Sequence, residues 1–156
     1  MKSDERPTFP TTYPKTGGAY LLECNVAAPL TLRVGRLGSL NVVPGRYLYV
    51  GSAYGPGGIA ARITRHQKQS GKRTHWHIDY LIEATGVAQA WAVPGGDECR
   101  IVSVLLNRET IFIPFPGFGS SDCKTCRAHL LNADKELCIS TLLDSAGIAI
   151  HTKQNQ

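Results

Sequence analysis

The sequence predicts a single α+β domain, in which a small, mainly antiparallel β-sheet is flanked by helices. Short strand-like runs follow one another closely between residues 19 and 50, which favours hairpin connections and antiparallel pairing. Helical and strand-like segments alternate irregularly over the rest of the chain, as is typical of α+β domains. The length of 156 residues suits one domain, and no internal repeat or linker divides it.

The composition is that of an ordinary globular protein, with 42% hydrophobic and 19% charged residues. The formal net charge of +5 permits a polyanionic partner without requiring one. No apolar run is long enough to cross a membrane, and residues 1–16 lack the apolar core of a signal peptide. We therefore expect a cytoplasmic protein with no membrane partner.

The chain contains five cysteines, and an odd number would leave one unpaired in a secreted protein. We expect reduced thiols and no disulfide, as in other cytoplasmic proteins. Cys24, Cys99 and Cys138 lie in apolar stretches, so we expect them to be small core residues.

The N-terminal half predicts an arm followed by several strands. Residues 1–16 are polar and rich in proline, which is typical of a flexible or extended arm, so the domain should span residues 17–153. Strands are expected over residues 19–25, 30–34 and 45–50, with a turn over 35–38 and a short extended segment over 40–43. A Gly- and Pro-rich loop over residues 54–58 then leads to a helix over 59–69.

The C-terminal half predicts three further helices. Residues 75–83 favour a helix that Thr74 caps and Gly86 stops, although a strand would place His75, His77 and Asp79 on one side. Asp97 should cap a helix over residues 98–107, and Asp134 one that ends near residue 145. Strands are expected over residues 87–93, 127–131 and 147–153, with a loop over 111–122.

The stretch from Gly45 to His66 concentrates groups suited to phosphate chemistry. Arg62 and His66 are four residues apart and share one helical face, and Arg65 lies at its edge. Arginine offers a planar, permanently charged donor fork to phosphate oxygens, and a histidine or tyrosine can carry a proton. A solvated basic surface helix is the alternative interpretation of this spacing.

Several blocks of the sequence resemble the GIY-YIG nuclease superfamily. The two halves of its signature are similar to Gly18-Ala19-Tyr20 and to Tyr49-Val50-Gly51 with the following helix. Residues 35–38 (GRLG), 75–81 (HWHIDYL) and 118–123 (FGSSDC) resemble a small stand-alone branch once filed as a domain of unknown function. The resemblance covers residues 17 to 131. It implies a GIY-YIG-like fold and a metal-dependent endonuclease that hydrolyses phosphodiester bonds in DNA.

The resemblance also implies a role for each signature residue. Tyr20 would be the base that deprotonates the attacking water, and Tyr49 would position water or phosphate. Arg62 would stabilise the charge that grows on the phosphate. His66 would relay a proton or contact the scissile phosphate.

Glu98 is the expected ligand of one divalent cation, Mg²⁺ or Mn²⁺. Magnesium keeps most of its waters and needs few protein carboxylates, and Glu98 stands where the resemblance places the metal-binding glutamate. A glutamate in the first turn of a helix is otherwise an ordinary surface residue, and Glu83 is the competing candidate.

The DNA is expected to meet basic and imidazole side chains beside these residues; they are Arg65, Lys68, Lys72, Arg73, His75 and His77. His75 and His77 could instead buttress Arg62 and His66. The chain lacks a separate recognition domain, so specificity would be low, directed by nucleic-acid structure, or supplied by a protein partner. RNA is not excluded as a substrate, and a binding module without efficient cleavage is the second functional hypothesis.

Cys123, Cys126 and His129 have the spacing of a zinc knuckle. Tetrahedral zinc needs a fourth ligand, and the spacing supplies none unless Asp122 or His75 folds close. Plain packing is therefore favoured over zinc, and a zinc-stabilised interaction domain is the third hypothesis.

Overall fold

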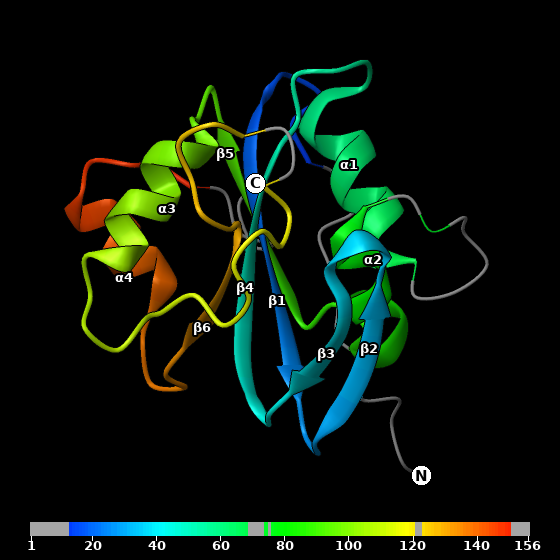
Figure 1. Cartoon of the computed structure of the whole chain (residues 1–156). Coiled ribbons are helices and arrows are strands. Elements are labelled where there is room, and N and C mark those ends of the chain that lie inside the picture. The colour runs from blue at the N-terminus through cyan, green and yellow to red at the C-terminus, as the bar shows by residue number, and fades with distance from the viewer. Residues whose placement is uncertain (1–12, 69–73, 75, 121–122, 151–156) are drawn as a thin grey trace, which may run out of the picture.

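The computed structural model describes residues 13–68, 74, 76–120 and 123–150, and it has the predicted α+β architecture (Figure 1). Four antiparallel strands form the main sheet in the order β5-β1-β4-β6. Their bounds are β1 (Gly18–Val26), β4 (Gly45–Ser52), β5 (Gln89–Pro94) and β6 (Leu130–Ala133). The strands expected in this sheet before residue 133 are thus confirmed, with shifts of up to three residues at their starts.

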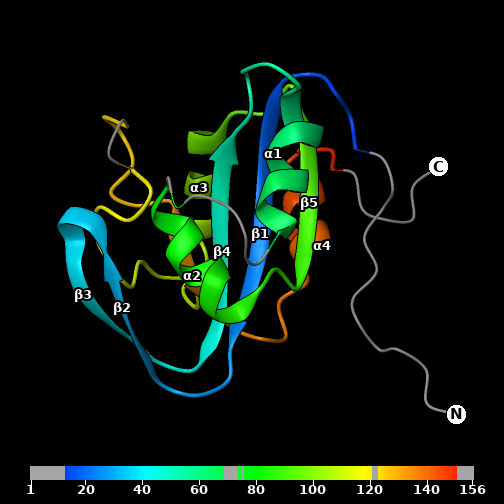
Figure 2. The ribbon, with the colours of Figure 1, turned by 90° about the vertical axis from the view of Figure 1, so that its right-hand side faces the viewer.

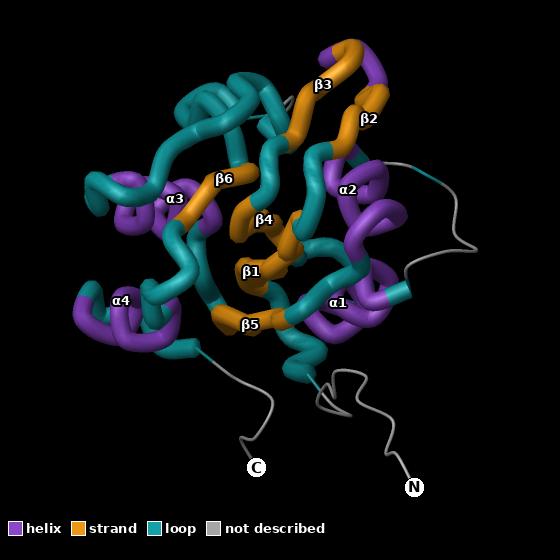
Figure 3. Tube along the Cα trace, turned by 90° about the horizontal axis from the view of Figure 1, so that it is seen from below, coloured by secondary structure: helices purple, strands orange, loops and turns teal. Residues whose placement is uncertain are grey.

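Two helices cover each face of this sheet (Figure 1 and Figure 3). The helices α1 (Gly58–Gln67) and α2 (His77–Thr85) pack on one face. The helices α3 (Glu98–Leu106) and α4 (Ile139–Ser145) pack on the other. None of the helices in the described ranges is long and apolar enough to cross a membrane.

The central strand β1 is buried on both sides because of these two helical layers. Its residues Tyr20 and Leu22 face the core under α1 and α2. Ala19 and Leu21 alternate with them and face the core under α3 and α4. Successive side chains of a strand point to opposite faces, so one strand contributes to two cores.

The strands β2 (Leu30–Val34) and β3 (Gly38–Val42) form a separate hairpin, joined by a short 3-10 turn over Gly35–Leu37. Figure 2 shows this hairpin beside α2, at one edge of the molecule. Its apolar side chains pack against the core under α1 and α2, while Arg33 on the other side is exposed. The alternating pattern of the sequence therefore divides the hairpin into a packed and a solvated side.

The packed domain extends to Tyr13, four residues before the expected boundary at Gly17. Tyr13 is 8% exposed, and its hydroxyl accepts a hydrogen bond from Gln67 Nε2 at 3.3 Å. The backbone N–H groups of Ile59 and Ala60 donate to the carbonyls of residues 16 and 14. These carbonyls satisfy first-turn donors of α1 that no helical partner can reach. Residues 1–12 of the expected arm lie outside the described residues.

The start of α2 differs from the prediction, because Trp76 and not Thr74 precedes its first turn. The Asp79 carboxylate accepts the backbone N–H of Trp76 at 2.8 Å, which is the helix-side half of a capping box. Asp79, which fixes the N-terminal end of α2, therefore lies inside the helix and not at the flanking position where a capping Ser or Thr is expected. Gly86 ends the helix as predicted, with φ of 74°.

The C-terminal segment contains two further corrections. The last helix starts at Ile139, and Cys138 rather than Asp134 occupies the position before it. Residues 147–150 of the expected edge strand are not in a strand, and residues 151–153 lie outside the described ranges. Both predictions depended on short apolar runs whose secondary structure depends on tertiary contacts.

The five cysteines, all of which lie within the described residues, form no disulfide in the structure. Cys24 is buried in the core, as expected. Cys138 is exposed, because it lies just outside α4 and only the next residue, Ile139, enters the core. Cys99 is half-buried and lies beside Cys123, so the expectation of plain core packing was wrong for both Cys99 and Cys138.

Candidate active site and cysteine cluster

A cavity of about 570 Å³ is lined by residues from both helical layers and from the sheet. Tyr20 comes from β1, Tyr49 from β4, Arg62 from α1 and Glu98 from α3. The four residues to which the resemblance assigns roles at one site therefore line the same cavity. The remaining lining residues are Ser52, Trp76, His77, Gly119, Cys123, Lys124 and His129.

The position of Tyr20 depends on a glycine in the neighbouring strand. Tyr20 pairs with Gly51 in the antiparallel register of β1 and β4. A Cβ on Gly51 would collide with the Tyr20 ring at Cζ, Oη and Cε1. The missing side chain therefore lets the ring lie across β4 toward α1, where His66 is located.

The Tyr20 hydroxyl belongs to a buried chain of polar groups. Its oxygen lies 2.9 Å from His66 Nε2, and His66 Nδ1 lies 3.8 Å from Asp79 Oδ1. Arg65 donates both guanidinium Nη atoms to the same carboxylate, at 2.9 and 3.1 Å. A carboxylate on the Nδ1 side favours a proton on that nitrogen, so Nε2 can accept the proton of Tyr20.

His66 itself is 0% exposed and contacts the rings of Tyr20, Tyr49 and Trp76. A direct contact with the scissile phosphate is therefore ruled out in this conformation, because the side chain does not reach the cavity. The relay role that the resemblance implies stays a prediction, and the hydrogen bond to Tyr20 is consistent with it.

Both tyrosines are neutral phenols in this environment. Burial raises the pKa of Tyr20 well above the usual value, and the charge of Arg62 offsets only part of this increase. Burial also raises the pKa of Tyr49 well above its usual range. Burial therefore disfavours a resting phenolate at neutral pH, so a proton accepted by the Tyr20 oxygen is best matched by transfer of its own phenol proton to a neighbour.

Arg62 lies on the cavity wall and is held by weak contacts. Its Nη1 donates to the Ser52 carbonyl at 3.4 Å, and its guanidinium carbon lies 4.9 Å from the centre of the Trp76 ring. Arg65 contacts the same ring at 4.5 Å. No carboxylate is bonded to Arg62 among the described residues, so its donor fork is available to an anion in the cavity.

His77 is held in one protonation state by the loop that follows α3. Its Nδ1 accepts the backbone N–H of Gly119 at 2.9 Å, and its ring meets Phe118 edge-on. Burial lowers the pKa of His77. The neutral ring must therefore carry its proton on Nε2, which makes this cavity-lining residue a hydrogen-bond donor.

Glu98 is in the first turn of α3, where the Asp97 side chain accepts the N–H of Cys99 at 3.0 Å and caps the helix as predicted. Glu98 Oε2 lies 3.3 Å from His129 Nδ1. Burial raises the pKa of Glu98, and His129 offsets part of this increase. The side chain remains 25% exposed and lines the cavity.

Four potential metal ligands converge next to Glu98. Each of these four residues offers one potential ligand atom, and the four atoms all lie within 4.8 Å of one another; the residues are Cys99, Cys123, Cys126 and His129. Cys99 Sγ is 3.4 Å from Cys123 Sγ, and the N–H of Cys126 points at Cys123 Sγ at 3.3 Å. His129 is 3% exposed, and its Nε2 has no hydrogen-bond partner in the described part of the chain. This cluster could hold a metal ion.

The fourth member of this cluster is the residue that the sequence interpretation missed. Cys99 belongs to a different element and lies 24 residues before Cys123, so no knuckle spacing reveals it. Its position next to Glu98 in the sequence was the available signal. The suggested alternatives, Asp122 and His75, lie outside the described residues.

Of the residues predicted to bind nucleic acid, the structure describes Arg65, Lys68 and His77, and of these three only His77 lines the cavity. Lys68 is exposed at the end of α1 and does not line the cavity, while Arg65 is bonded to Asp79. His77 does line the cavity. The other three predicted residues lie outside the described ranges; they are Lys72, Arg73 and His75.

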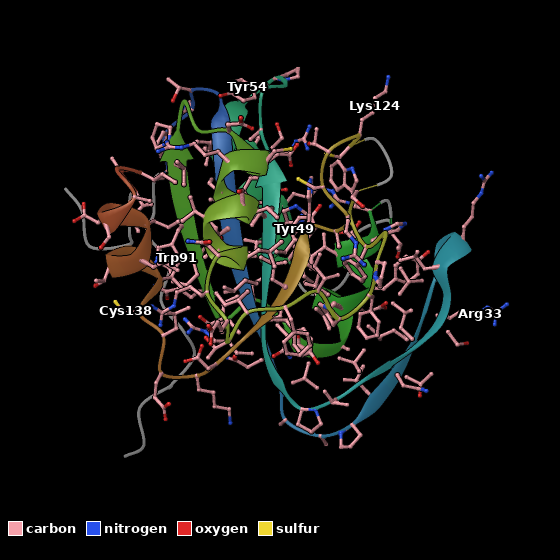
Figure 4. The ribbon with its side chains drawn as sticks, turned by 60° about the vertical axis from the view of Figure 1, so that its left-hand side comes forward. Arg33, Tyr49, Tyr54, Trp91, Lys124 and Cys138 are labelled. Carbon is pink, nitrogen blue, oxygen red and sulfur yellow. The ribbon has the colours of Figure 1, made fainter. Side chains whose placement is uncertain are left out.

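Four cavity residues were not predicted as site residues; they are Ser52, Trp76, Gly119 and Lys124. Lys124 lines the cavity, and Figure 4 shows its side chain extending outward at the edge of the molecule. Trp76 supports both arginines of α1. Trp76 belongs to the HWHIDYL block that the sequence singled out, whereas nothing in the local sequence marked Lys124.

Comparison with protein-family models matches residues 19–150 to a family described as a domain of unknown function, DUF123. A search of curated proteins gave no match, and a search of solved structures gave none either.

Proposed function

The chain belongs to the DUF123 family, and from this premise we propose that it is a metal-dependent endonuclease that hydrolyses phosphodiester bonds in DNA. The observation that carries this proposal is the shared cavity of Tyr20, Tyr49, Arg62 and Glu98. These are the residues to which the GIY-YIG resemblance assigns catalytic roles. Their side chains come from four separate elements, so a common cavity is not a consequence of proximity in the sequence.

The hydrogen bond between Tyr20 and His66 supports a route for the water proton. The attacking water transfers a proton to the Tyr20 oxygen as the phenol proton moves to His66 Nε2. The nearby Asp79 carboxylate stabilises the imidazolium that results. This route avoids a free phenolate, which the burial of Tyr20 disfavours.

The other cavity residues suit the stabilisation of the phosphate in the transition state. Arg62 presents a planar fork to the two oxygens on which charge grows, and such a donor matters most in the transition state. The neutral His77 ring donates Nε2–H to a phosphate oxygen. Tyr49 positions the water or the phosphate with its phenol.

Glu98 would hold the divalent cation, Mg²⁺ or Mn²⁺. The carboxylate fits this role because it lines the cavity and meets His129 through Oε2, which leaves Oε1 for a ligand. Magnesium needs only one or two protein carboxylates, since waters complete its octahedron. When bound, the ion supplies charge that polarises the phosphate and the leaving oxygen.

The cysteine cluster is a separate site, and we propose that it holds zinc. Three thiolates and an imidazole form a soft, four-ligand set that suits tetrahedral zinc and not magnesium. Cys99 supplies the fourth ligand that the sequence interpretation lacked, and the buried Nε2 of His129, which has no hydrogen-bond partner among the described residues, is available as the imidazole ligand atom. Four protein ligands close the coordination shell, so this zinc would be structural.

A cleavage assay tests the proposed nuclease. Single-stranded, duplex, branched and gapped DNA and matched RNA substrates are incubated with wild-type protein and with Glu98→Gln, in Mg²⁺, in Mn²⁺ and in chelator. We expect cation-dependent cleavage of at least one DNA structure by the wild type and its loss in the variant. Tight binding without cleavage of any substrate would support the non-catalytic binding module instead.

A further inference from the structure

We infer that the Cys3His centre, formed by Cys99, Cys123, Cys126 and His129, sets the position of Glu98 and so controls the affinity of the cavity for its divalent cation. The inference rests on the proposed function, because it gives Glu98 the role of cation ligand. It adds a positioning residue, His129, and makes the zinc centre a regulator of the active site.

His129 connects the two sites through its two ring nitrogens. Nδ1 lies 3.3 Å from Glu98 Oε2, and Nε2 is buried without a partner in the described residues. A metal on Nε2 would leave the single remaining ring proton on Nδ1, directed at Glu98. Metal-binding histidines commonly donate their second nitrogen to a carboxylate in this way, which fixes both the ring and the carboxylate.

The same turn of α3 carries a ligand and the carboxylate. Cys99 follows Glu98 directly, and its N–H is bonded to the Asp97 side chain that caps the helix. A metal bound through Cys99 would therefore hold the backbone of this turn against the segment that contains Cys123, Cys126 and His129. The Glu98 side chain would be restrained from both ends, by its backbone and by His129.

This restraint matters because Glu98 is the carboxylate among the described residues that line the cavity. Its side chain is one-quarter exposed and would otherwise sample several rotamers, which weakens the binding of an ion held by a single protein ligand. The centre thus favours an oriented carboxylate in the cavity.

The test uses a variant that separates zinc binding from the link to Glu98. His129→Cys completes a four-cysteine zinc set but removes the imidazole. Zinc content is measured by elemental analysis, folding by thermal melting, and Mn²⁺ affinity by electron paramagnetic resonance. Glu98→Gln is the positive control, and Glu109→Gln, an exposed carboxylate that does not line the cavity, is the matched negative control.

We expect His129→Cys to keep one zinc and wild-type melting but to bind Mn²⁺ about 10-fold to 100-fold more weakly. The inference is overturned if this variant holds zinc and binds Mn²⁺ as the wild type does. It is also overturned if the wild type holds no zinc, or holds zinc but binds no Mn²⁺ at Glu98.

A second measurement covers the case in which His129→Cys does not fold or hold zinc. Wild-type protein is stripped of zinc, freed of chelator and titrated with Mn²⁺ before and after zinc is restored. We expect Mn²⁺ affinity to fall on stripping and to recover with zinc, and an unchanged affinity would reject the inference. A wild type that shows this coupling yet cleaves no nucleic acid would reject the proposed nuclease alone.

Discussion

Mutation of Arg62 can separate the proposed contribution of its charge to catalysis from its contribution to packing. Arg62→Ala removes a fork that faces the cavity and a contact with the Trp76 ring, but no core side chain. We expect cleavage to slow by about 100-fold or more. The free energy of unfolding should fall by no more than about 1 kcal/mol. Single-turnover cleavage and thermal melting measure the two effects.

The controls for this prediction come from the same chain. Arg33→Ala removes an exposed arginine on the hairpin, which Figure 4 shows at the outer edge of the molecule, and should change neither quantity. Arg62→Lys should rescue cleavage poorly, since an ammonium cannot reproduce the planar fork. Wild-type cleavage by Arg62→Ala would show that Arg62 is not catalytic, and a large loss of melting temperature would show that it is structural.

The two cavity tyrosines should respond differently to loss of the hydroxyl. Tyr20→Phe removes the buried hydrogen bond between the Tyr20 hydroxyl and His66 Nε2, so unfolding free energy should fall by about 1–3 kcal/mol in addition to a loss of cleavage. Tyr49→Phe removes a hydroxyl with no hydrogen bond in the described residues, so cleavage should fall while unfolding free energy stays within about 0.5 kcal/mol. Equal stability losses, measured by denaturant unfolding, would contradict this division.

His77 should make the folded state sensitive to acid. Its folded pKa is lowered by burial, whereas the unfolded chain has the ordinary value of about 6.5. The unfolded state therefore binds more protons, so the His77 contribution to stability is complete above about pH 6.5 and is lost as the pH falls through the folded pKa. Protonation also removes the Nδ1 acceptor of the Gly119 N–H.

His77→Asn tests this dependence, because an amide oxygen can accept the same N–H but does not titrate. Unfolding free energies are measured from about pH 8 to about pH 5, on either side of the ordinary histidine pKa. The wild type should lose more stability than the variant over the acidic part of this range. Parallel curves for the two proteins would mean that His77 does not carry the effect.

At the scale of elements, the pairing of β1 with β4 places Tyr20 over Gly51. Gly51→Ala places a methyl group in the space that the Tyr20 ring occupies, and this overpacking should lower the free energy of unfolding by about 1–3 kcal/mol. Because the ring must move, we also expect cleavage activity to fall. Gly51 has no positive φ, so the effect is steric and not conformational.

A double-mutant cycle checks this mechanism by denaturant unfolding. In the Tyr20→Ala background the added methyl group meets no ring, so Gly51→Ala should cost much less there than in the wild type. If the losses in unfolding free energy of the two substitutions are additive, Gly51 is required in β4 for a reason other than the space that it leaves for the Tyr20 ring.

At the scale of the whole molecule, the cysteine cluster joins α3 to the chain segment between α3 and β6. Cys99→Ser should abolish zinc binding. If zinc is present at about 100 times its dissociation constant, the loss corresponds to about 2.7 kcal/mol. For a domain of this size the melting temperature should fall by about 5–11 °C.

Cys138→Ser is the matched control, because Cys138 is also a free thiol but lies outside the cluster and is exposed. It should keep full zinc content and wild-type melting. If Cys99→Ser behaves like Cys138→Ser in both elemental analysis and thermal melting, the cluster holds no structural metal.

The sequence by itself determined the fold class and the strand and helix pattern up to α3, while the signature residues of the cavity came from the resemblance to the GIY-YIG superfamily. This pattern depends on local information: alternation in β2, glycine at the end of α2, and Asp97 before α3. Such features act within a few residues, where backbone geometry and side-chain spacing decide the outcome.

Tertiary structure alone decided which side chains meet. The Tyr20–His66 hydrogen bond joins residues 46 positions apart, and Cys99 reaches Cys123 across 24 positions. It also decided that His66 is buried behind the cavity, and that Asp79 both caps α2 and holds Arg65. These relations follow from the packing of two helical layers on one sheet, and packing depends on long-range contacts that no local pattern in the chain encodes.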